Sequence, residues 1–370
     1  MSRAEAAVTA EGARLPRLAI GRRSIPVVLP ARGDPRLKLA AIIITLQVLG
    51  QTVLGFRVSI AQILVSILLC AAIEVAVTYR RSGMLVWPGS AMLTGNSVAF
   101  ILRTSGTQHG DWWSLNGIEF FVLACVLSML SKYLIRPGGA HVFNPSNVGL
   151  VWTFLLVGPV HVFPQYLWWG PIGLPVVLAL LVILAGAVWI LRSVRMYQMA
   201  VAFFVPFAAI VAVLALAGRS FYAVWNPNPI SGLSYFTNIV LSPEIMVFVF
   251  FMMSDPRTAA KTPAGRIAYG VSTAVVAGAL ISFQSTEFGI KLGILASLTV
   301  TCALVPLIDR WAARAAKARE DAPARARYGR AALVAVVIVA VAAPVNTAAL
   351  ANNEEIVLIE RGLLGPSSPQ

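Results

Sequence analysis

Two polar, proline-containing segments interrupt the apolar sequence, and they hold the side chains most able to bind a charged or polar ligand. The later segment supplies a carboxylate, guanidinium groups and a hydroxyl; its residues are Asp255, Pro256, Arg257, Thr258, Gly265 and Arg266. The earlier segment supplies amides and a hydroxyl, from Asn144, Pro145, Ser146 and Asn147. Backbone that leaves a helix at membrane depth is tolerated only where protein or a water-filled cavity satisfies its polar groups. Both segments therefore predict a site.

The chemistry expected of the two segments differs. Asn144 and Asn147 stand at the head of an apolar run, where such side chains cap the first N–H groups of a helix. The start of a broken helix also attracts anions such as phosphate, but capping alone is the preferred interpretation. Arg257 and Arg266 are able to grip a phosphate or a lipid headgroup, although the positive-inside rule by itself predicts cations at this position.

Two carboxylates lie within apolar runs, Glu74 in the second and Glu244 early in the eighth. An ionisable group inside a membrane segment is a functional hypothesis by default, here a proton or cation relay. The alternative is a buried carboxyl that is neutral or paired with a local partner. Glu244 is the better relay candidate, because Pro243 breaks the helix immediately before it.

Composition identifies the chain as a polytopic membrane protein. Of its 370 residues, 58% are hydrophobic and 12% are charged, against about 25% charged in a soluble domain. The formal net charge of +14 reflects Lys and Arg at segment ends, where they set orientation, and does not indicate nucleic-acid binding. The three cysteines lack metal-ligand spacing, which excludes a zinc or iron–sulfur site built by this chain alone. No complete catalytic motif is present.

About eleven apolar segments have the length of membrane spans. They are 39–56, 59–79, 84–102, 117–135, 145–160, 171–191, 198–217, 235–253, 267–283, 289–308 and 331–350. Every second loop is basic, which places the N-terminus in the cytoplasm. We further predict a disordered basic tail over 1–36, a basic cytoplasmic linker over 310–330, and an extra helix with an outside tail over 331–370.

The domain 37–309 is predicted to contain two inverted repeats, 37–161 and 171–309. Five spans in each half place the second half upside down relative to the first, as in inverted-topology repeats. The third segments of the two halves open alike, with the polar stretches 88–96 and 230–238. The expected fold is therefore all-α, with two inverted five-helix repeats and broken helices.

The two proline-containing segments resemble the family of NqrB and RnfD. These are membrane subunits of the Na⁺-translocating NADH:quinone oxidoreductase and of the Rnf ferredoxin:NAD⁺ oxidoreductase. The resemblance rests on 143–146 with Gly149, and on 253–258 with Thr262, Gly265, Arg266, Tyr269 and Gly270. It covers roughly 39–306 and implies a ten-span inverted repeat in the inner (plasma) membrane of a bacterial cell. The stretches 92–96, 106–113 and 285–289 are most similar to the UnbU-type branch found beside enediyne antibiotic gene clusters.

The resemblance also implies a flavin. In the family, a Thr that ends a Ser-Gly-Ala-Thr motif carries FMN through a phosphoester. The matching stretch here is Ser231, Gly232, Leu233 and Ser234, and the replacement of Thr by Ser makes covalent attachment doubtful. Thr237 is one helical turn away and out of register. The candidate cofactor-binding residues are Ser231, Gly232, Ser234, Thr237, Asn144, Ser146, Asn147 and Thr94.

Two hypotheses of function follow. The first is a membrane subunit for flavin-linked electron transfer, coupled or not to ion movement, with redox subunits as partners. The second is a cofactor-less transporter, export or self-resistance component associated with enediyne-type biosynthesis, which the altered acceptor residue favours. A scaffold for a biosynthetic complex is a third, weaker alternative.

Overall fold

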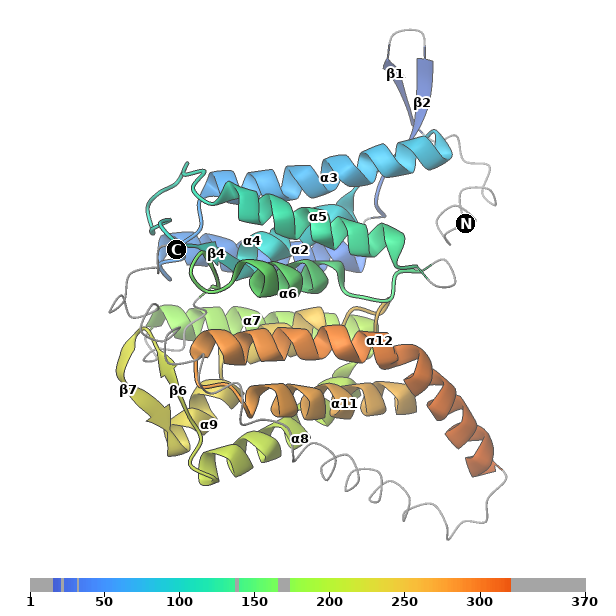
Figure 1. Ribbon diagram of the computed structural model, residues 1–370. Helices are drawn as coiled ribbons and strands as arrows, with labels where there is room; N and C mark the ends of the chain where they lie inside the picture. Colours follow the sequence, from blue (N-terminus) through green and yellow to red (C-terminus); the bar gives the residue numbers. More distant parts are fainter. Residues whose placement is uncertain (1–15, 21–22, 32, 137–139, 166–173, 321–370) are drawn as a thin grey trace.

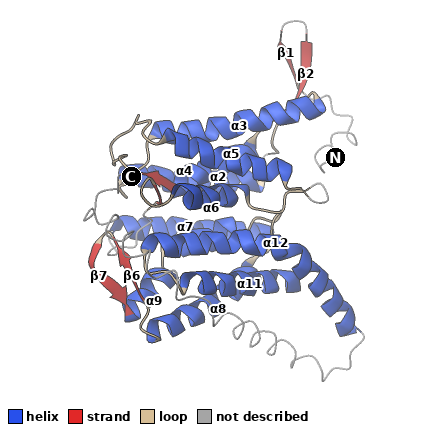
Figure 2. Ribbon diagram, viewed as in Figure 1, coloured by secondary structure: helices blue, strands red, loops and turns tan. Residues whose placement is uncertain are grey.

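The computed structural model describes residues 16–20, 23–31, 33–136, 140–165 and 174–320 (Figure 1). Helices run across almost all of this part of the chain, and the few strands lie at the ends of the helices (Figure 2). Six helical segments of the described residues are long and apolar enough to cross a membrane. The prediction of an all-α polytopic membrane protein is therefore confirmed.

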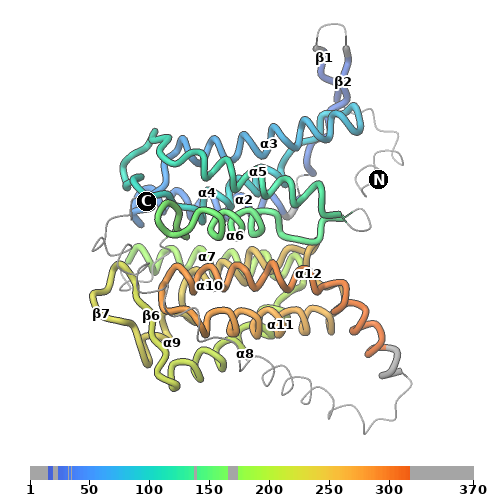
Figure 3. The backbone as a smooth tube through the Cα atoms, viewed as in Figure 1, coloured from blue at the N-terminus to red at the C-terminus, as the bar shows by residue number. Residues whose placement is uncertain are grey.

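The helices form two layers, each made from one half of the chain (Figure 3). The first layer holds α2 (Pro35–Thr52), α3 (Ile60–Ser82), α4 (Gly89–Ile101), α5 (Ile118–Leu134) and α6 (Pro145–Val157). The second holds α7 (Leu174–Val194), α8 (Tyr197–Leu216), α9 (Gly232–Val240), α10 (Pro243–Val247), η2 (Phe248–Met252), α11 (Pro263–Ile281) and α12 (Glu287–Glu320). Nine of the first ten predicted spans each coincide with one of these helices, and the span 235–253 covers α9, α10 and η2. The predicted span 331–350 lies outside the described residues.

Several helices begin with a proline at the first helical position. The side chain of the residue before this proline caps the helix. At the start of α6, the Asn144 side chain accepts a hydrogen bond from the backbone N–H of Asn147. At the start of α11, the Thr262 side chain accepts one from the backbone N–H of Gly265. Proline fits this position because its missing N–H would have no intrahelical partner there. The capping role that the sequence predicts for Asn144 is confirmed.

Short strand pairs close one end of the bundle. Strand β4 (Leu102–Thr104) pairs with β5 (Val162–Pro164), and β6 (Ser220–Ala223) pairs with β7 (Asn226–Ser231). We call this the β4–β7 end; α3, α9 and α12 begin there, and α4 and α6 finish there. Helices α6 and α11 begin at the opposite end, which also holds the loop 253–262.

Two predicted boundaries are wrong. The tail 1–36 is not without structure, because β1 (Arg17–Ile20) and β2 (Arg23–Val28) form an antiparallel hairpin and β2 pairs in parallel with β3 (Leu85–Val86). The predicted linker also fails over 310–320, where α12 continues to Glu320. That stretch is rich in Ala, Arg, Lys and Glu, which are strong helix formers. Figure 1 shows α12 bending away from the bundle, and Pro306 lies within this helix.

The two layers meet through equivalent helices of the predicted repeats. Helix α2 contacts α7, and α6 contacts α12. Within the layers, α5 packs on α3 and α6 as α11 packs on α8 and α12. In an inverted repeat, a two-fold axis in the membrane plane relates the two halves. Helices next to this axis contact the equivalent helix of the other half, here the first helices α2 and α7 and the last helices α6 and α12. This packing supports the inverted repeat, which remains a prediction.

Close packing inside the first layer depends on Gly149, where α6 crosses α5. A Cβ atom at this position would lie 2.0 Å from Ser128 Oγ and 2.3 Å from Ala124 O. We therefore expect Gly149→Ala to reduce stability by about 1–3 kcal/mol, the usual cost of overpacking. The midpoint of thermal unfolding in detergent measures this. Gly33→Ala is the control, because no atom lies within 4 Å of a Cβ there, and equal midpoints for both variants would contradict the prediction.

Candidate functional site

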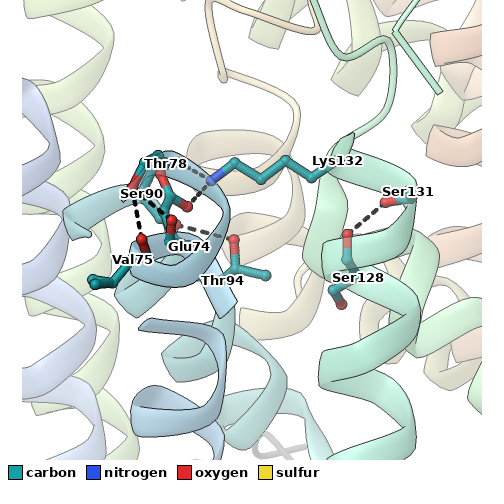
Figure 4. A network of polar contacts seen from close by, with 8 residues as sticks. All are labelled: Glu74, Val75, Thr78, Ser90, Thr94, Ser128, Ser131 and Lys132. Atoms are coloured by element: carbon teal, nitrogen blue, oxygen red, sulfur yellow. Dashed lines mark hydrogen bonds and ion pairs between the residues drawn. The ribbon is translucent and has the colours of Figure 1, made fainter. Parts of the chain in front are cut away.

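The first buried polar group lies between α3, α4 and α5, and we call it the Glu74 cluster (Figure 4). The Lys132 ammonium contacts the Glu74 carboxylate and donates a hydrogen bond of 3.2 Å to Ser90 Oγ. Thr94 Oγ1 donates to Ser90 O at 3.0 Å. Both charged side chains are largely buried, with 7% of Lys132 and 13% of Glu74 exposed. Glu74 therefore has the local partner that the sequence left open as the alternative to a relay.

The second group, the Glu244 cluster, joins α10, α12 and the strands of the β4–β7 end. Lys291 Nζ lies 3.1 Å from Glu244 Oε1 and 2.6 Å from Glu287 Oε1. It also donates to Gln165 O at 3.1 Å, just beyond β5. The Trp225 indole N–H donates to Glu287 Oε2 at 3.1 Å. The ammonium of Lys291 on α12 therefore contacts α10 and the residue after β5, and Trp225 joins the cluster through Glu287.

The two clusters differ in formal charge. The Glu74 cluster pairs one carboxylate with one ammonium, whereas the Glu244 cluster has two carboxylates around one ammonium. A buried charge is costly unless it is paired and hydrogen-bonded. The Glu74 cluster thus holds one carboxylate for one ammonium, and the ion pairs of the Glu244 cluster bring two carboxylates to one ammonium.

The predicted flavin-attachment stretch lies on the surface of the β4–β7 end. Ser231 ends β7 and precedes the first turn of α9, and Ser231, Gly232 and Ser234 are all exposed. Gly232 has a φ of +58°, a left-handed conformation that glycine adopts without strain. The Thr237 hydroxyl donates back into its own helix, to Leu233 O at 3.1 Å. Ser234 is thus a serine on an accessible helical turn.

Asn144, Ser146 and Asn147 lie at the opposite end and connect the two layers. Asn144 Nδ2 donates to Met252 O at 3.3 Å, and its Oδ1 accepts from Ser146 Oγ at 3.0 Å. Asn147 Nδ2 donates to Leu295 O and Thr299 Oγ1 on α12, both at 2.9 Å. These contacts hold α6 against η2 and α12.

The candidate cofactor-binding residues therefore do not form one site. Ser231, Gly232, Ser234 and Thr237 gather at the β4–β7 end, and the three residues around Asn144 gather at the opposite end. Thr94 belongs to the Glu74 cluster. The reason is topological: α9 and α6 enter the bundle from different ends.

The loop 253–262 is fixed by its own residues and by α11. Asp255 Oδ1 accepts from the Arg257 amide at 3.0 Å, and Thr258 is buried beside the exposed Pro256. The Arg266 guanidinium donates to Ala260 O at 3.3 Å and to Arg195 O at 3.0 Å. Gly265 lies in the first turn of α11, where its backbone N–H donates to the Thr262 hydroxyl. Arg266 thus connects the loop 253–262 to the turn between α7 and α8. The Arg257 side chain is exposed.

His141 lies in the loop before α6, outside the helices and close to this region. Burial lowers the pKa of its imidazole, an effect that the Asp255 charge opposes.

Sequence reasoning missed Lys132, Lys291, Glu287, Trp225 and Gln165 as members of the buried clusters. The positive-inside rule alone accounts for a lysine at position 132, so its place in the sequence does not reveal the cluster. The local signal for the second cluster was Glu287 followed four residues later by Lys291, a spacing that places the two side chains on one helical face. The three cysteines are buried, and Cys125 Sγ donates to Ser66 O on α3 at 3.7 Å.

Together these features define a polytopic membrane protein whose helical bundle encloses ionisable groups and bears an exposed serine stretch at one end. Residues 162–317 match the sequence model of the NQR2, RnfD, RnfE family. This match covers a little under half of the chain, in its second part, and agrees there with the resemblance that the sequence predicts. The matched region contains the serine stretch, the Glu244 cluster and the loop 253–262. No curated protein matches the chain significantly.

Proposed function

We propose that the protein is a membrane subunit that passes electrons across the bilayer by means of a flavin attached at the start of α9. The observation that carries this proposal is the family match over 162–317, because that region presents Ser231, Gly232 and Ser234 on an exposed helical turn. Redox subunits of the same membrane complex are the partners. By the positive-inside rule, the β4–β7 end faces outside and the loop 253–262 faces the cytoplasm.

The residues present fit a phosphorylated flavin. The Ser234 hydroxyl has the chemistry needed to form a phosphoester, and its exposed turn gives room for a bulky group. When bound, the flavin would supply one-electron transfer. The chain itself supplies the attachment point, a bundle that excludes water, and buried carboxylates for coupling to ion movement, namely Glu74 and Glu244.

Ser234→Ala is expected to abolish flavin that remains with the protein after denaturation. Removing the hydroxyl removes the only atom of that side chain able to form the phosphoester. In-gel fluorescence and the absorption spectrum after denaturation and filtration measure the retained flavin. Ser82→Ala is the matched control, since Ser82 is an exposed serine far from α9.

Three outcomes discriminate the possibilities. Loss of retained flavin in Ser234→Ala alone supports the proposal with Ser234 as acceptor. Loss in Thr237→Ala instead moves the attachment by one turn. A well-folded wild-type protein without any flavin overturns the electron-transfer proposal.

A colourless protein would favour the second function, a transporter or export component that keeps the fold. The observation in its favour is Ser234 itself, where the family has the acceptor Thr. Association with enediyne-type biosynthesis belongs to this alternative. Substrate efflux from vesicles that is impaired by Glu74→Gln or Glu244→Gln would support it.

A further inference from the structure

We propose that the first layer contains a binding groove for a hydroxylated amphiphilic carboxylate, whose charged end pairs with Arg36 and whose hydroxyl donates to Asn96. The groove lies between α2, α3 and α4 and has a volume of about 120 Å³. Its ligand is an acid with an apolar chain and a hydroxyl group about 10 Å from the carboxylate, the depth of the groove along α4. The inference goes beyond electron transfer and does not depend on a flavin.

The inner end of the groove holds an amide group that lacks a hydrogen bond. Asn96 on α4 lines the groove, only 4% of this residue is exposed, and its Oδ1 accepts no hydrogen bond from the described residues. A buried polar group without a partner is costly in a membrane domain, because lipid offers it no hydrogen bond. A buried water molecule needs about two to four polar partners, and Asn96 is the one polar residue among those that line the groove below its mouth. A ligand hydroxyl supplies the missing donor.

The walls of the groove fit a hydrocarbon chain. Three helices supply apolar side chains to them, namely Leu37, Ala40 and Ile44 on α2, Ile67 on α3, and Met92 and Leu93 on α4. Leu37 is 41% exposed and Ile44 is 52% exposed, so an apolar chain can enter between the helices from the bilayer. Gly89 and Asn96 line the groove seven residues apart on α4, which corresponds to about 10 Å along the helix axis. A medium-length chain therefore reaches from the mouth to the amide.

The mouth of the groove presents the guanidinium of Arg36. Its Nε donates to both carboxylate oxygens of Asp34 at 2.9 Å, and its Nη2 contacts Asp34 Oδ2. These contacts use one edge of the guanidinium and fix its orientation. An arginine side chain has further N–H donors, and 42% of the Arg36 side chain is exposed. The second edge, formed by Nη1 and Nη2, matches a planar carboxylate in a pair of parallel hydrogen bonds.

The N-terminal hairpin completes the mouth. Strand β2 pairs with β3, and the Trp87 backbone N–H donates to Val28 O at 2.9 Å. This pairing brings Pro30 and Trp87 to the rim of the groove. Tryptophan is typical of the membrane interface, where its ring meets hydrocarbon and its N–H meets polar groups. The hairpin, which takes no part in the serine stretch or the buried clusters, therefore forms one side of the entrance.

Equilibrium binding of radiolabelled ω-hydroxydecanoate to the purified full-length protein in lipid nanodiscs tests the proposal, with decanoate as the matched probe. Protein-free nanodiscs measure partition into the bilayer, which is subtracted. The wild-type protein is expected to bind ω-hydroxydecanoate about tenfold more tightly than decanoate, the effect of one buried hydrogen bond. Arg36→Gln should weaken the binding of both probes by about tenfold or more, because both lose the charged partner of their carboxylate.

Variants in the groove separate its two polar ends. Asn96→Leu keeps the size of the side chain and removes the amide, so ω-hydroxydecanoate should then bind only as tightly as decanoate. Ala40→Phe fills the groove and should abolish the binding of both probes. Asn228→Leu on β7 and Arg192→Gln on α7 change exposed residues outside the groove, and these control variants should bind both probes as the wild type does.

Equal affinities of the wild-type protein for the two probes would overturn the assignment of Asn96, and this comparison needs no variant. Binding that is unchanged in Arg36→Gln would overturn the assignment of the mouth. If neither probe bound above the protein-free nanodiscs, the proposal would be wrong, and a phospholipid retained by the protein in native mass spectrometry would assign the groove to bilayer lipid instead. None of these readouts requires bound flavin, so a failure here is distinct from a failure of the electron-transfer proposal.

Discussion

Lys132→Met is expected to destabilise the protein by about 3–5 kcal/mol, the usual cost of removing one partner from a buried ion pair. Methionine keeps most of the length of the lysine side chain, so the packing between α5 and α3 changes little. The Glu74 carboxylate, however, loses the ammonium that contacts it and stays largely buried. The expected result is a much lower thermal unfolding midpoint in detergent and a lower yield of monodisperse protein.

The double variant Glu74→Gln with Lys132→Met separates the charge effect from packing. Replacing both members of a buried pair is often nearly neutral, so the double variant should recover most of the lost stability. Lys261→Met, at an exposed lysine, is the matched control and should change the midpoint little. If the double variant were as unstable as Lys132→Met, the loss would come from packing and not from an unpaired Glu74.

The positions of the helices are predictable from the sequence because they depend on local properties. Runs of apolar residues of membrane-spanning length are sufficient to locate them, and Pro145 and Pro263, each after a capping side chain, fix where α6 and α11 begin. The error at the N-terminal end has another cause. Strand β2 is held by β3, more than fifty residues away, and such a partner is invisible to a local pattern.

The candidate site was predicted only in part, since its contacts are made across the fold. Glu74 and Glu244 are conspicuous as carboxylates in apolar runs, but their lysine partners lie on other helices. Lys132 is explained equally well by the positive-inside rule, so its role in the Glu74 cluster could not be distinguished from orientation. Ser234 and Asn144 are far apart because their helices begin at opposite ends of the bundle. The alternation of basic loops in the sequence already predicts these opposite directions.

Lys291→Met is expected to have a larger effect than Lys132→Met. It removes the ammonium shared by two carboxylates, so Glu244 and Glu287 would face each other without a cation among the cluster residues. The loss of the ion pair costs about 3–5 kcal/mol, and repulsion between the carboxylates adds to it. We expect little folded protein at neutral pH, measured as the monodisperse fraction after purification.

The instability of Lys291→Met should depend on pH in a defined direction. Without the ammonium, the folded state holds the two carboxyl groups best when they are protonated, and the unfolded state leaves them ionised in water. The folded state then binds more protons, so stability falls as pH rises and recovers as pH is lowered. Adding Glu287→Gln should reduce this dependence by about half, because the folded state then takes up one extra proton instead of two. Lys291→Arg keeps the charge and is the control. If the unfolding midpoint of Lys291→Met did not change with pH, the two carboxylates would not be the cause of its instability.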